Sequence, residues 1–143
     1  EISESAQLLE IIHAILGPEV VVANESLIIS MPGTTDQAWH ADGPHMSVTE
    51  HLPAHCLNVF IPMVDITLEE GPTEFRPASH FMTRDLKNMF LLAALKKELL
   101  PNQKPLMKKG SALLFDYRIL HRGTANRTSV PRPVYVLTFG KSW

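Results

Sequence analysis

The chain has 143 residues, of which 45% are hydrophobic and 20% are charged, and its formal net charge is −2. This length and composition are typical of one globular domain, which we expect to span residues 1–143. A charge this close to zero, without a run of basic residues, argues against a nucleic-acid partner. No apolar run approaches the length of about 18 residues that a membrane-spanning helix needs, so we expect no membrane span.

Cys56 is the only cysteine. A single cysteine forms no internal disulfide, which fits a reducing compartment, so we expect an intracellular and cytoplasmic protein. The chain begins at Glu1 rather than Met and shows no charged-then-apolar leader. We therefore expect a core fragment of a longer protein. Nothing in the sequence specifies an oligomeric state.

The first predicted element is an amphipathic helix over residues 4–16. Leu8, Ile12 and Leu16 recur there at helical spacing, and Gly17-Pro18 ends the pattern. The region that follows predicts, in order, strands over 20–22 and 27–31, a loop over 32–36 and a short strand or strand end over 38–42.

The rest of the chain continues as short apolar segments separated by turn-forming residues. It predicts, in order, a loop over 45–54 that partly covers the site, strands over 55–64 and 73–76, a helix over 81–99, and strands over 111–120 and 133–139. In the first of these strands, Leu57, Val59 and Ile61 share one face, while Asn58 and Phe60 point the other way. Several short strands with few helices favour a mainly β fold, but periodicity does not choose among jelly rolls, barrels and α+β folds.

The pattern His40-x-Asp42 is the strongest chemical signal in the sequence. On a strand, side chains two residues apart point to the same face, so both groups can reach one ion. His121, where the predicted strand 111–120 ends, can add a third ligand from a distant strand. Two imidazoles and one carboxylate form the ligand set of a mononuclear non-haem iron site with about three open positions. A zinc site with the same ligands is equally possible on spacing alone.

Arg132 is the second signal. If strands 111–120 and 133–139 pair as an antiparallel hairpin, Arg132 returns to the neighbourhood of His121. A guanidinium group there can bind a carboxylate through two parallel hydrogen bonds. The sequence therefore predicts a metal site with a nearby cation for an acidic co-substrate.

Three separated motifs stand out in the sequence: Pro32-Gly33 followed by Gln37-x-Trp39-His40-x-Asp42, Glu70-Gly71-Pro72-Thr73 followed by Pro77-x-Ser79-His80, and His121-x-Gly123 followed by Asn126 and Arg132. Together they resemble the phytanoyl-CoA dioxygenase family of iron(II)- and 2-oxoglutarate-dependent oxygenases. The resemblance runs from about residue 17 to about residue 140. It implies a mainly β fold with flanking helices, the double-stranded β-helix or jelly roll of the cupin type.

The resemblance also implies roles for individual residues. His40, Asp42 and His121 would bind iron(II), and Arg132 would hold the distal carboxylate of 2-oxoglutarate. The implied reaction uses O2 and 2-oxoglutarate to hydroxylate a C–H bond of a small or lipid-like substrate, releasing succinate and CO2. Further expected contacts are Gln37, Asn58 and Thr73 with the co-substrate, and Trp39 and His45 with the substrate.

Two positions bear on the details of this reading. Related halogenases have a small residue in place of the carboxylate ligand, so Asp42 favours hydroxylation over halogenation. Related enzymes often carry Ser or Thr two residues after the second iron-binding histidine, adding a hydrogen bond to 2-oxoglutarate. Here that residue is Gly123, and Thr124 is displaced by one step. The alternatives are a non-catalytic metal-binding jelly-roll module, a zinc-dependent hydrolase with the same ligands, and a partial domain that needs further segments.

Overall fold

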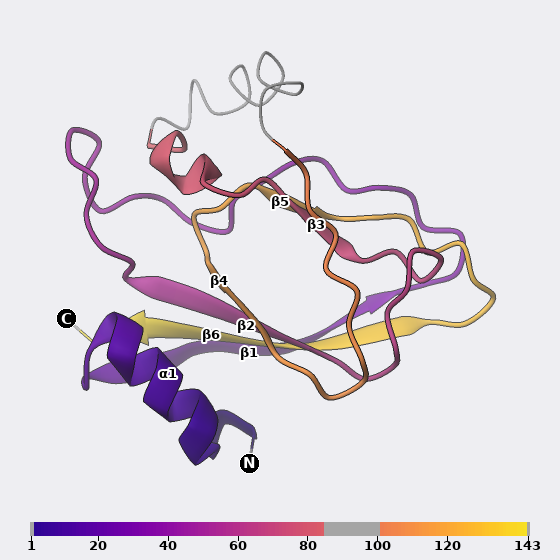
Figure 1. The fold of residues 1–143 in the computed structure, drawn as a ribbon, viewed down its shortest axis with the longest axis horizontal. Helices are drawn as coiled ribbons and strands as arrows, with labels where there is room; N and C mark the ends of the chain where they lie inside the picture. The colour runs from indigo at the N-terminus through magenta and orange to yellow at the C-terminus, as the bar shows by residue number, and fades with distance from the viewer. Residues whose placement is uncertain (1, 85–100, 143) are drawn as a thin grey trace.

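The computed structural model describes residues 2–84 and 101–142 as two antiparallel sheets with short helices at their margins (Figure 1). The elements in chain order are the 3-10 helix η1 (Ile2–Glu4), α1 (Ala6–Leu16), β1 (Val20–Ser30), β2 (Cys56–Pro62), β3 (Thr73–Phe75), the 3-10 helix η2 (Ser79–Phe81), β4 (Leu113–Asp116), β5 (His121–Gly123) and β6 (Arg132–Lys141). One sheet has the order β1-β6-β2-β4 and the other pairs β3 with β5. This two-sheet arrangement is a jelly roll, so the predicted fold class is confirmed.

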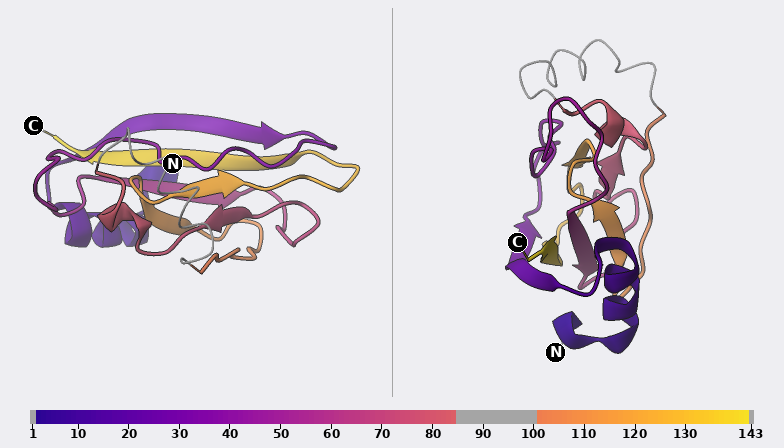
Figure 2. Two further views of the ribbon diagram at one scale, coloured as in Figure 1. Left: turned by 90° about the horizontal axis from the view of Figure 1, so that it is seen from above. Right: turned by 90° about the vertical axis from the view of Figure 1, so that its left-hand side faces the viewer.

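The four-stranded sheet has one face packed on α1 and one face turned toward the small sheet (Figures 1 and 2). Side chains alternate between the two faces because successive residues of a strand point in opposite directions. The outer face forms the main core with the buried stripe of α1: Leu57, Val59, Ile61, Leu137 and Phe139 pack with Leu8, Ile12 and Leu16. The face assigned from the sequence to Leu57, Val59 and Ile61 is therefore confirmed, and Asn58 and Phe60 face inward.

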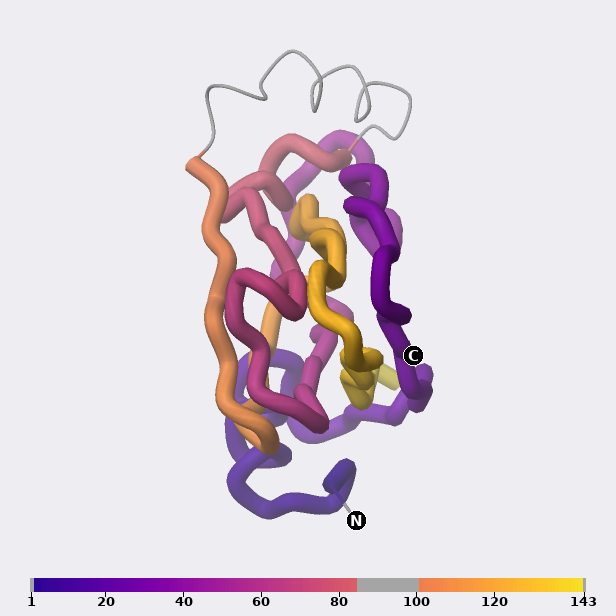
Figure 3. The backbone as a smooth tube through the Cα atoms, turned by 90° about the vertical axis from the view of Figure 1, so that its right-hand side faces the viewer, coloured from indigo at the N-terminus to yellow at the C-terminus, as the bar shows by residue number. Residues whose placement is uncertain are grey.

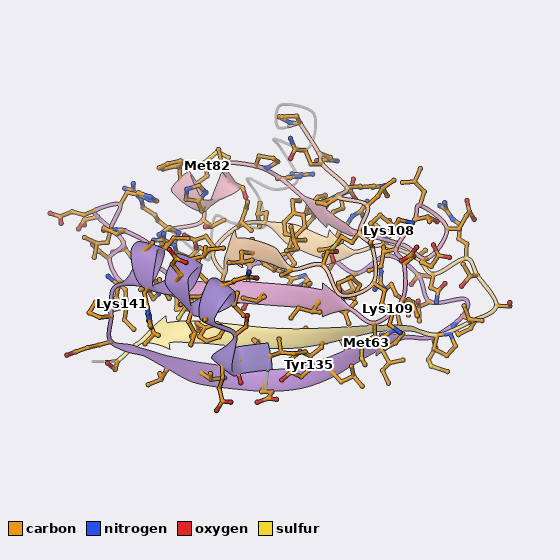
Figure 4. The ribbon with its side chains drawn as sticks, turned by 60° about the horizontal axis from the view of Figure 1, so that its bottom comes forward. Met63, Met82, Lys108, Lys109, Tyr135 and Lys141 are labelled. Carbon is orange, nitrogen blue, oxygen red and sulfur yellow. The ribbon has the colours of Figure 1, made fainter. Side chains whose placement is uncertain are left out.

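β1 is one long edge strand, where the sequence predicted two short strands separated by a turn. It pairs with β6 from Val20 opposite Lys141 to Ser30 opposite Arg132. The turn-like residues after Val22 are absorbed by a bulge between Val22 and Asn24, which keeps the ladder continuous. β1 forms one edge of the four-stranded sheet, as the backbone trace shows (Figure 3). On the outer face Tyr135 of β6 donates a hydrogen bond to Glu25 of β1 (Figure 4).

The predicted strand over 111–120 is too long, because β4 spans only Leu113–Asp116 and a turn follows Asp116. The Asp116 carboxylate accepts hydrogen bonds from the backbone N–H of Arg118 at 2.9 Å and from its Nη2 at 2.6 Å. The N–H of Ile119 donates to the Asp116 carbonyl at 3.0 Å and closes the turn. The predicted hairpin with the last strand is also wrong, because β6 lies between β1 and β2 while β4 pairs with β2 alone.

Besides α1, the described helices are short. The 3-10 helix η2 leads into a turn over residues 82–84. The rest of the helix predicted over 81–99 lies outside the described residues. Within residues 2–84 and 101–142, no helix combines the length and the apolar character that crossing a membrane requires.

Candidate functional site

His40 lies opposite His121, the first residue of β5, in an isolated antiparallel bridge. The backbone N–H of His40 donates to the carbonyl of His121 at 3.0 Å, and the N–H of His121 donates to the carbonyl of His40 at 2.9 Å. Such a reciprocal pair is the unit of an antiparallel ladder. The predicted strand end over 38–42 therefore contributes one bridge only. That bridge sets the two imidazoles side by side, with ring centroids 4.4 Å apart.

Asp42 completes a compact group of three. Nε2 of His40 lies 3.6 Å from Oδ1 of Asp42, and Nε2 of His121 lies 3.5 Å from Oδ2. One candidate ligand atom from each residue falls within 4.8 Å of the other two. In the part of the chain that the structure describes, no other cluster of three histidine, cysteine or acidic residues has this geometry. The structure thus brings together the three predicted ligands, and their role as ligands stays a prediction.

Main-chain carbonyl groups orient both imidazoles. Nδ1 of His40 lies 2.9 Å from the carbonyl oxygen of Ala38, and Nδ1 of His121 lies 3.0 Å from that of Ile119. Because a carbonyl oxygen can only accept, each Nδ1 carries the hydrogen and each Nε2 presents a lone pair on the side of Asp42. This is the tautomer that a histidine needs when Nε2 binds a metal ion.

His121 is only 3% exposed and is surrounded by aromatic rings. Phe75 stacks on its imidazole with centroids 5.8 Å apart, and Phe115 meets it edge-on at 5.0 Å. Burial lowers the pKa of His121 below its ordinary value, although the Asp42 carboxylate acts in the opposite direction. His121 is therefore neutral at neutral pH, as a metal ligand must be.

Asn58 of β2 positions the Asp42 carboxylate. Its Nδ2 donates to Oδ2 of Asp42 at 2.5 Å, while the Thr138 hydroxyl of β6 donates to its Oδ1 at 2.7 Å. Because a carboxylate can only accept, the NH2 group must face Asp42, and the Thr138 hydroxyl then donates to the remaining amide oxygen. The sequence predicted a co-substrate contact for Asn58. In the structure its amide nitrogen donates to Asp42 and its side chain lines the cavity, so the co-substrate contact stays a prediction.

Substituting Asn58→Leu is expected to weaken binding of a divalent metal ion by about 10- to 100-fold, because groups that orient metal ligands contribute on that scale. Calorimetric titration with manganese(II) measures the loss. Thr138→Val leaves the Asn58 donor in place and removes only the hydrogen bond to its Oδ1, so a smaller loss is expected. Unchanged affinity in Asn58→Leu would contradict a positioning role.

Tyr117 fixes the chain immediately after Asp42. Its carbonyl accepts the N–H of Asp42 at 2.9 Å, and its hydroxyl donates to the carbonyl of Pro44 at 3.0 Å. A Cβ on Gly43 would lie 1.9 Å from the Tyr117 ring, so only glycine fits there. Burial raises the pKa of Tyr117 to about 12, which keeps the hydroxyl protonated as a donor. The glycine after His40-x-Asp42 was the sequence signal for this contact.

A cavity of about 430 Å³ opens beside the three residues. Its size is within the range of small-molecule sites. All four residues predicted to contact the co-substrate lie in its wall: Gln37, Asn58, Thr73 and Arg132. The sequence analysis missed the contribution of β1, because residues 24–26 read as a turn. The β1 residues in the wall are Ala23, Asn24, Ser26 and Ile28. The predicted covering loop 45–54 contributes no residue to the wall.

Arg132 is 6% exposed, and its Nε and Nη1 have no hydrogen-bond partner within the described residues. Burial lowers the pKa of this guanidinium from its ordinary value. Arg132 reaches the cavity as the first residue of β6, on the same strand face as Val134 and Val136, and not through the predicted hairpin. A buried cation without an acceptor is unfavourable. The arrangement therefore suits an anionic ligand in the cavity.

Trp39 and His45, the predicted substrate contacts, do not line this cavity. The Trp39 ring lies 4.3 Å from the guanidinium carbon of Arg76 and 5.0 Å from that of Arg122. His45 places Nε2 2.9 Å from the Thr83 hydroxyl. Trp39 thus packs against the outer side of the small sheet, since the alternation at His40 turns it away from the cavity.

His45 makes the metal-free protein sensitive to acid. Burial is the larger cause and the positive charge of the neighbouring Arg118 the next, and together they lower the pKa of His45 to about 4. In the unfolded chain the pKa is near 6.5, so between these two values the unfolded state binds more protons and stability falls as pH decreases. His45→Gln should lose less stability than the wild type between pH 7 and pH 5, measured as the urea midpoint. An equal loss in both proteins would refute this assignment. Part of the sensitivity remains in the variant because the pKa values of His51 and His80 are also lowered.

Comparison with known proteins identifies the family of this chain. The model of the family described as "Phytanoyl-CoA dioxygenase (PhyH)" matches residues 3–134. The chain is 30% identical over 115 residues to "Dioxygenase hkm4" of Aspergillus hancockii, a match that covers 76% of this chain and 34% of that protein. The chain thus spans about a third of the length of this curated relative.

Solved structures share the fold at low sequence identity. AviO1 from Streptomyces viridochromogenes superposes with a TM-score of 0.78 and 19% identity, over 98% of this chain and 59% of that one. EctD from S. alaskensis, solved with bound Fe, superposes with a TM-score of 0.75 and 22% identity, over 98% of this chain and 51% of that one. The resemblance inferred from the three sequence motifs is confirmed by the family match. The chain belongs to the phytanoyl-CoA dioxygenase family.

Proposed function

We propose that the protein is an iron(II)- and 2-oxoglutarate-dependent dioxygenase that hydroxylates a C–H bond of a small or lipid-like substrate. One observation carries the proposal: His40, Asp42 and His121 converge beside a cavity whose wall holds the buried guanidinium of Arg132, and its Nε and Nη1 have no hydrogen-bond partner among the described residues. A three-ligand metal site and an anion site open into the same space. Family membership and the Fe and 2-oxoglutarate named for EctD structures support this assignment.

The three ligand side chains fit iron(II). Two neutral imidazole nitrogens and one carboxylate leave about three coordination positions for a chelating co-substrate and dioxygen. When bound, iron supplies the activation of O2, and 2-oxoglutarate supplies two electrons as it is converted to succinate and CO2. The protein holds the ligand tautomers through Ala38 and Ile119 and holds the carboxylate through Asn58.

Arg132 is the proposed anchor for the distal carboxylate of 2-oxoglutarate. Its fork of donors matches the two oxygens of a carboxylate, and the unpaired Nε and Nη1 are available for that pairing. Thr73 lines the same cavity and is a further candidate contact. With the co-substrate bound, the apolar part of the wall remains for the substrate, formed by Ile28, Phe60 and Val136 among others. That surface favours a small or lipid-like molecule.

Asp42 favours hydroxylation over halogenation in this proposal. The carboxylate occupies the third protein position of the cluster, so no ligand position is left open for a halide in its place. Asn58 and the backbone bond to Tyr117 hold Asp42 in that position.

The test is release of labelled CO2 from 2-oxoglutarate carrying the label at its first carbon, with iron(II) and ascorbate in air. The wild-type chain should release CO2 and form succinate in equal amounts, and His40→Ala should release neither above background. Equal rates in the two proteins would refute the assignment of the site.

The same assay separates the alternatives. A metal-binding module without turnover binds iron(II) but releases no CO2. A zinc hydrolase keeps its activity with zinc in the absence of oxygen, whereas a dioxygenase stops. A partial domain binds both iron(II) and 2-oxoglutarate but releases CO2 without oxidising any substrate, an outcome relevant to a chain that spans about a third of its curated relative.

A further inference from the structure

The segment that carries His40 and Asp42 is attached to the small sheet by few backbone hydrogen bonds. His40 pairs with His121 in one bridge, and the N–H of Gln37 donates to the carbonyl of Gly123 at 2.9 Å. Among the described residues the bridge is isolated, whereas β6 forms continuous ladders with both β1 and β2. A segment with so few backbone bonds opens easily unless side chains hold it. The position of the His40 imidazole therefore depends on further contacts.

Trp39 supplies such contacts on the outer side of the small sheet. It points away from the His40 imidazole, because neighbouring residues of an extended segment face opposite ways. The guanidinium carbons of Arg76 and Arg122 lie over its ring, 4.3 Å and 5.0 Å from the centroid. Both are within the distance of about 6 Å at which a cation is attracted to an indole face. Burial, and next the positive charge of Arg122, lowers the pKa of Arg76, so the two cations are close neighbours.

Both arginines belong to the part of the small sheet that carries His121. Arg122 follows His121 in β5, and the backbone N–H of Arg76 donates at 2.9 Å to the carbonyl of the residue before His121. Trp39 in turn directly precedes His40. Trp39, Arg76 and Arg122 are all absent from the cavity wall. These three side chains thus connect the neighbours of the two candidate histidine ligands from the side opposite the cavity.

Two carboxylates hold Arg122 in this position. Its Nε donates to Oε2 of Glu74 at 2.7 Å, directly across the pair of β3 and β5 (Figure 1). Its Nη2 lies 3.1 Å from Oδ2 of Asp36. The Glu74 side chain is only 5% exposed, so salt screens this ion pair little. Because Asp36 is three residues before Trp39, Arg122 contacts the ligand-bearing segment at two points.

We propose that Trp39, Arg76 and Arg122 form a clamp that positions the His40 imidazole for metal binding. The inference rests on the proposed function, and it adds residues outside the cavity on which the affinity of the metal site depends. They are positioning residues, since they act through the backbone of the ligand-bearing segment and not on the ion. The main core lies elsewhere, between α1 and the four-stranded sheet, so the clamp can be lost without loss of the fold.

Calorimetric titration of the metal-free protein with manganese(II) tests the clamp. Trp39→Leu should raise the Kd by about tenfold, at the low end of the range for groups that orient metal ligands. Trp39→Phe restores an aromatic face and should stay within about threefold of the wild type. Lys104→Met is the matched control, because Lys104 lies 3.7 Å from Glu74 in the same charge network, and its Kd should be unchanged. Ile12→Val, in the main core, should lower the urea midpoint but not the affinity.

A double variant shows whether the clamp acts as one unit. Arg122→Met keeps an unbranched side chain but removes the charge, and it should raise the Kd by about tenfold. Trp39→Leu/Arg122→Met should stay within about threefold of either single variant, because each change already opens the clamp. A loss near the product of the two single effects would mean independent contributions and would overturn the clamp.

Hydrogen exchange in the metal-free protein separates positioning from loss of stability. The amides of His40 and His121 donate across the bridge. Trp39→Leu should speed their exchange by about tenfold or more, while amides in the ladder between β2 and β6 keep their wild-type rates. Equal acceleration at all of these amides would identify Trp39 as a structural residue only and overturn its positioning role.

The wild-type titration separates this inference from the proposed function. If the wild-type protein binds no manganese(II), the proposed function fails and the positioning role fails with it. If the wild type binds manganese(II) and Trp39→Leu binds as tightly as Lys104→Met, the clamp alone is overturned.

Discussion

Substituting His121→Ala is expected to abolish high-affinity binding of a divalent metal ion, with a loss of at least about 100-fold, and with it all decarboxylation of 2-oxoglutarate. The expected loss exceeds that for a group that only orients a ligand, which is about 10- to 100-fold. His121 contributes one of three donors, and its Nε2 has its lone pair on the side of Asp42. Titration with manganese(II), followed by calorimetry, measures the effect.

Two further variants separate loss of the ligand from loss of the fold. The bridge between His40 and His121 is made by backbone groups, so the alanine variant can keep it. Asp42→Asn has nearly the shape of the original side chain but no charge, and it should also weaken metal binding strongly. His13→Ala, on the exposed side of α1, is the control with unchanged affinity. If His121→Ala binds manganese(II) as tightly as this control, the metal site lies elsewhere.

The second large effect concerns Arg132, whose substitution should change binding and stability in opposite directions. Arg132→Met removes both donors offered to a carboxylate, and breaking such a buried ion pair costs about 3 kcal/mol or more, a loss of at least about 100-fold in affinity for 2-oxoglutarate. In the protein without ligand, the same change removes buried donors that have no acceptor among the described residues. Relief of that penalty should stabilise the fold by about 1–3 kcal/mol.

Urea unfolding and titration with 2-oxoglutarate, both on the same preparations, check the two signs. Arg127→Met is the matched control, since Arg127 is exposed and does not line the metal cavity, and it should change neither quantity. Arg132→Lys keeps the charge but not the fork, so partial loss of binding is expected. An Arg132→Met protein that is less stable than the wild type and still binds 2-oxoglutarate normally would show that Arg132 has a structural role only.

The three candidate metal ligands were the part of the site most accessible from the sequence. His40 and Asp42 are two residues apart, so local geometry alone sets them on one side of the chain. His121 required a long-range pairing, and the family motif supplied what spacing did not. Arg132 was placed beside His121 through a hairpin that does not exist. It reaches the cavity because β6 begins at Arg132, opposite Ser30, and alternates from there along the inner face.

The errors arose where tertiary contacts override local pattern. Asn58 faces the cavity as predicted, but only the structure shows that its NH2 group donates to Asp42 and that its oxygen accepts from Thr138. Residues 24–26 have the composition of a turn, yet pairing with β6 keeps them in a strand with a bulge. Trp39 and His45 lie outside the cavity wall, Trp39 beside Arg76 and His45 beside Thr83, and their contact with a substrate stays a prediction.

β1 lies at the edge of the four-stranded sheet and contributes side chains to the cavity wall. Its only sheet neighbour among the described strands is β6, and its wall residues include Ser26 and Ile28. The core that supports stability lies instead between α1 and the outer face of β2 and β6. Substitutions at Ser26 or Ile28 can therefore reshape the cavity with little effect on folding or on the metal ligands. On β1, the shape of the cavity can thus change separately from the core that stabilises the fold.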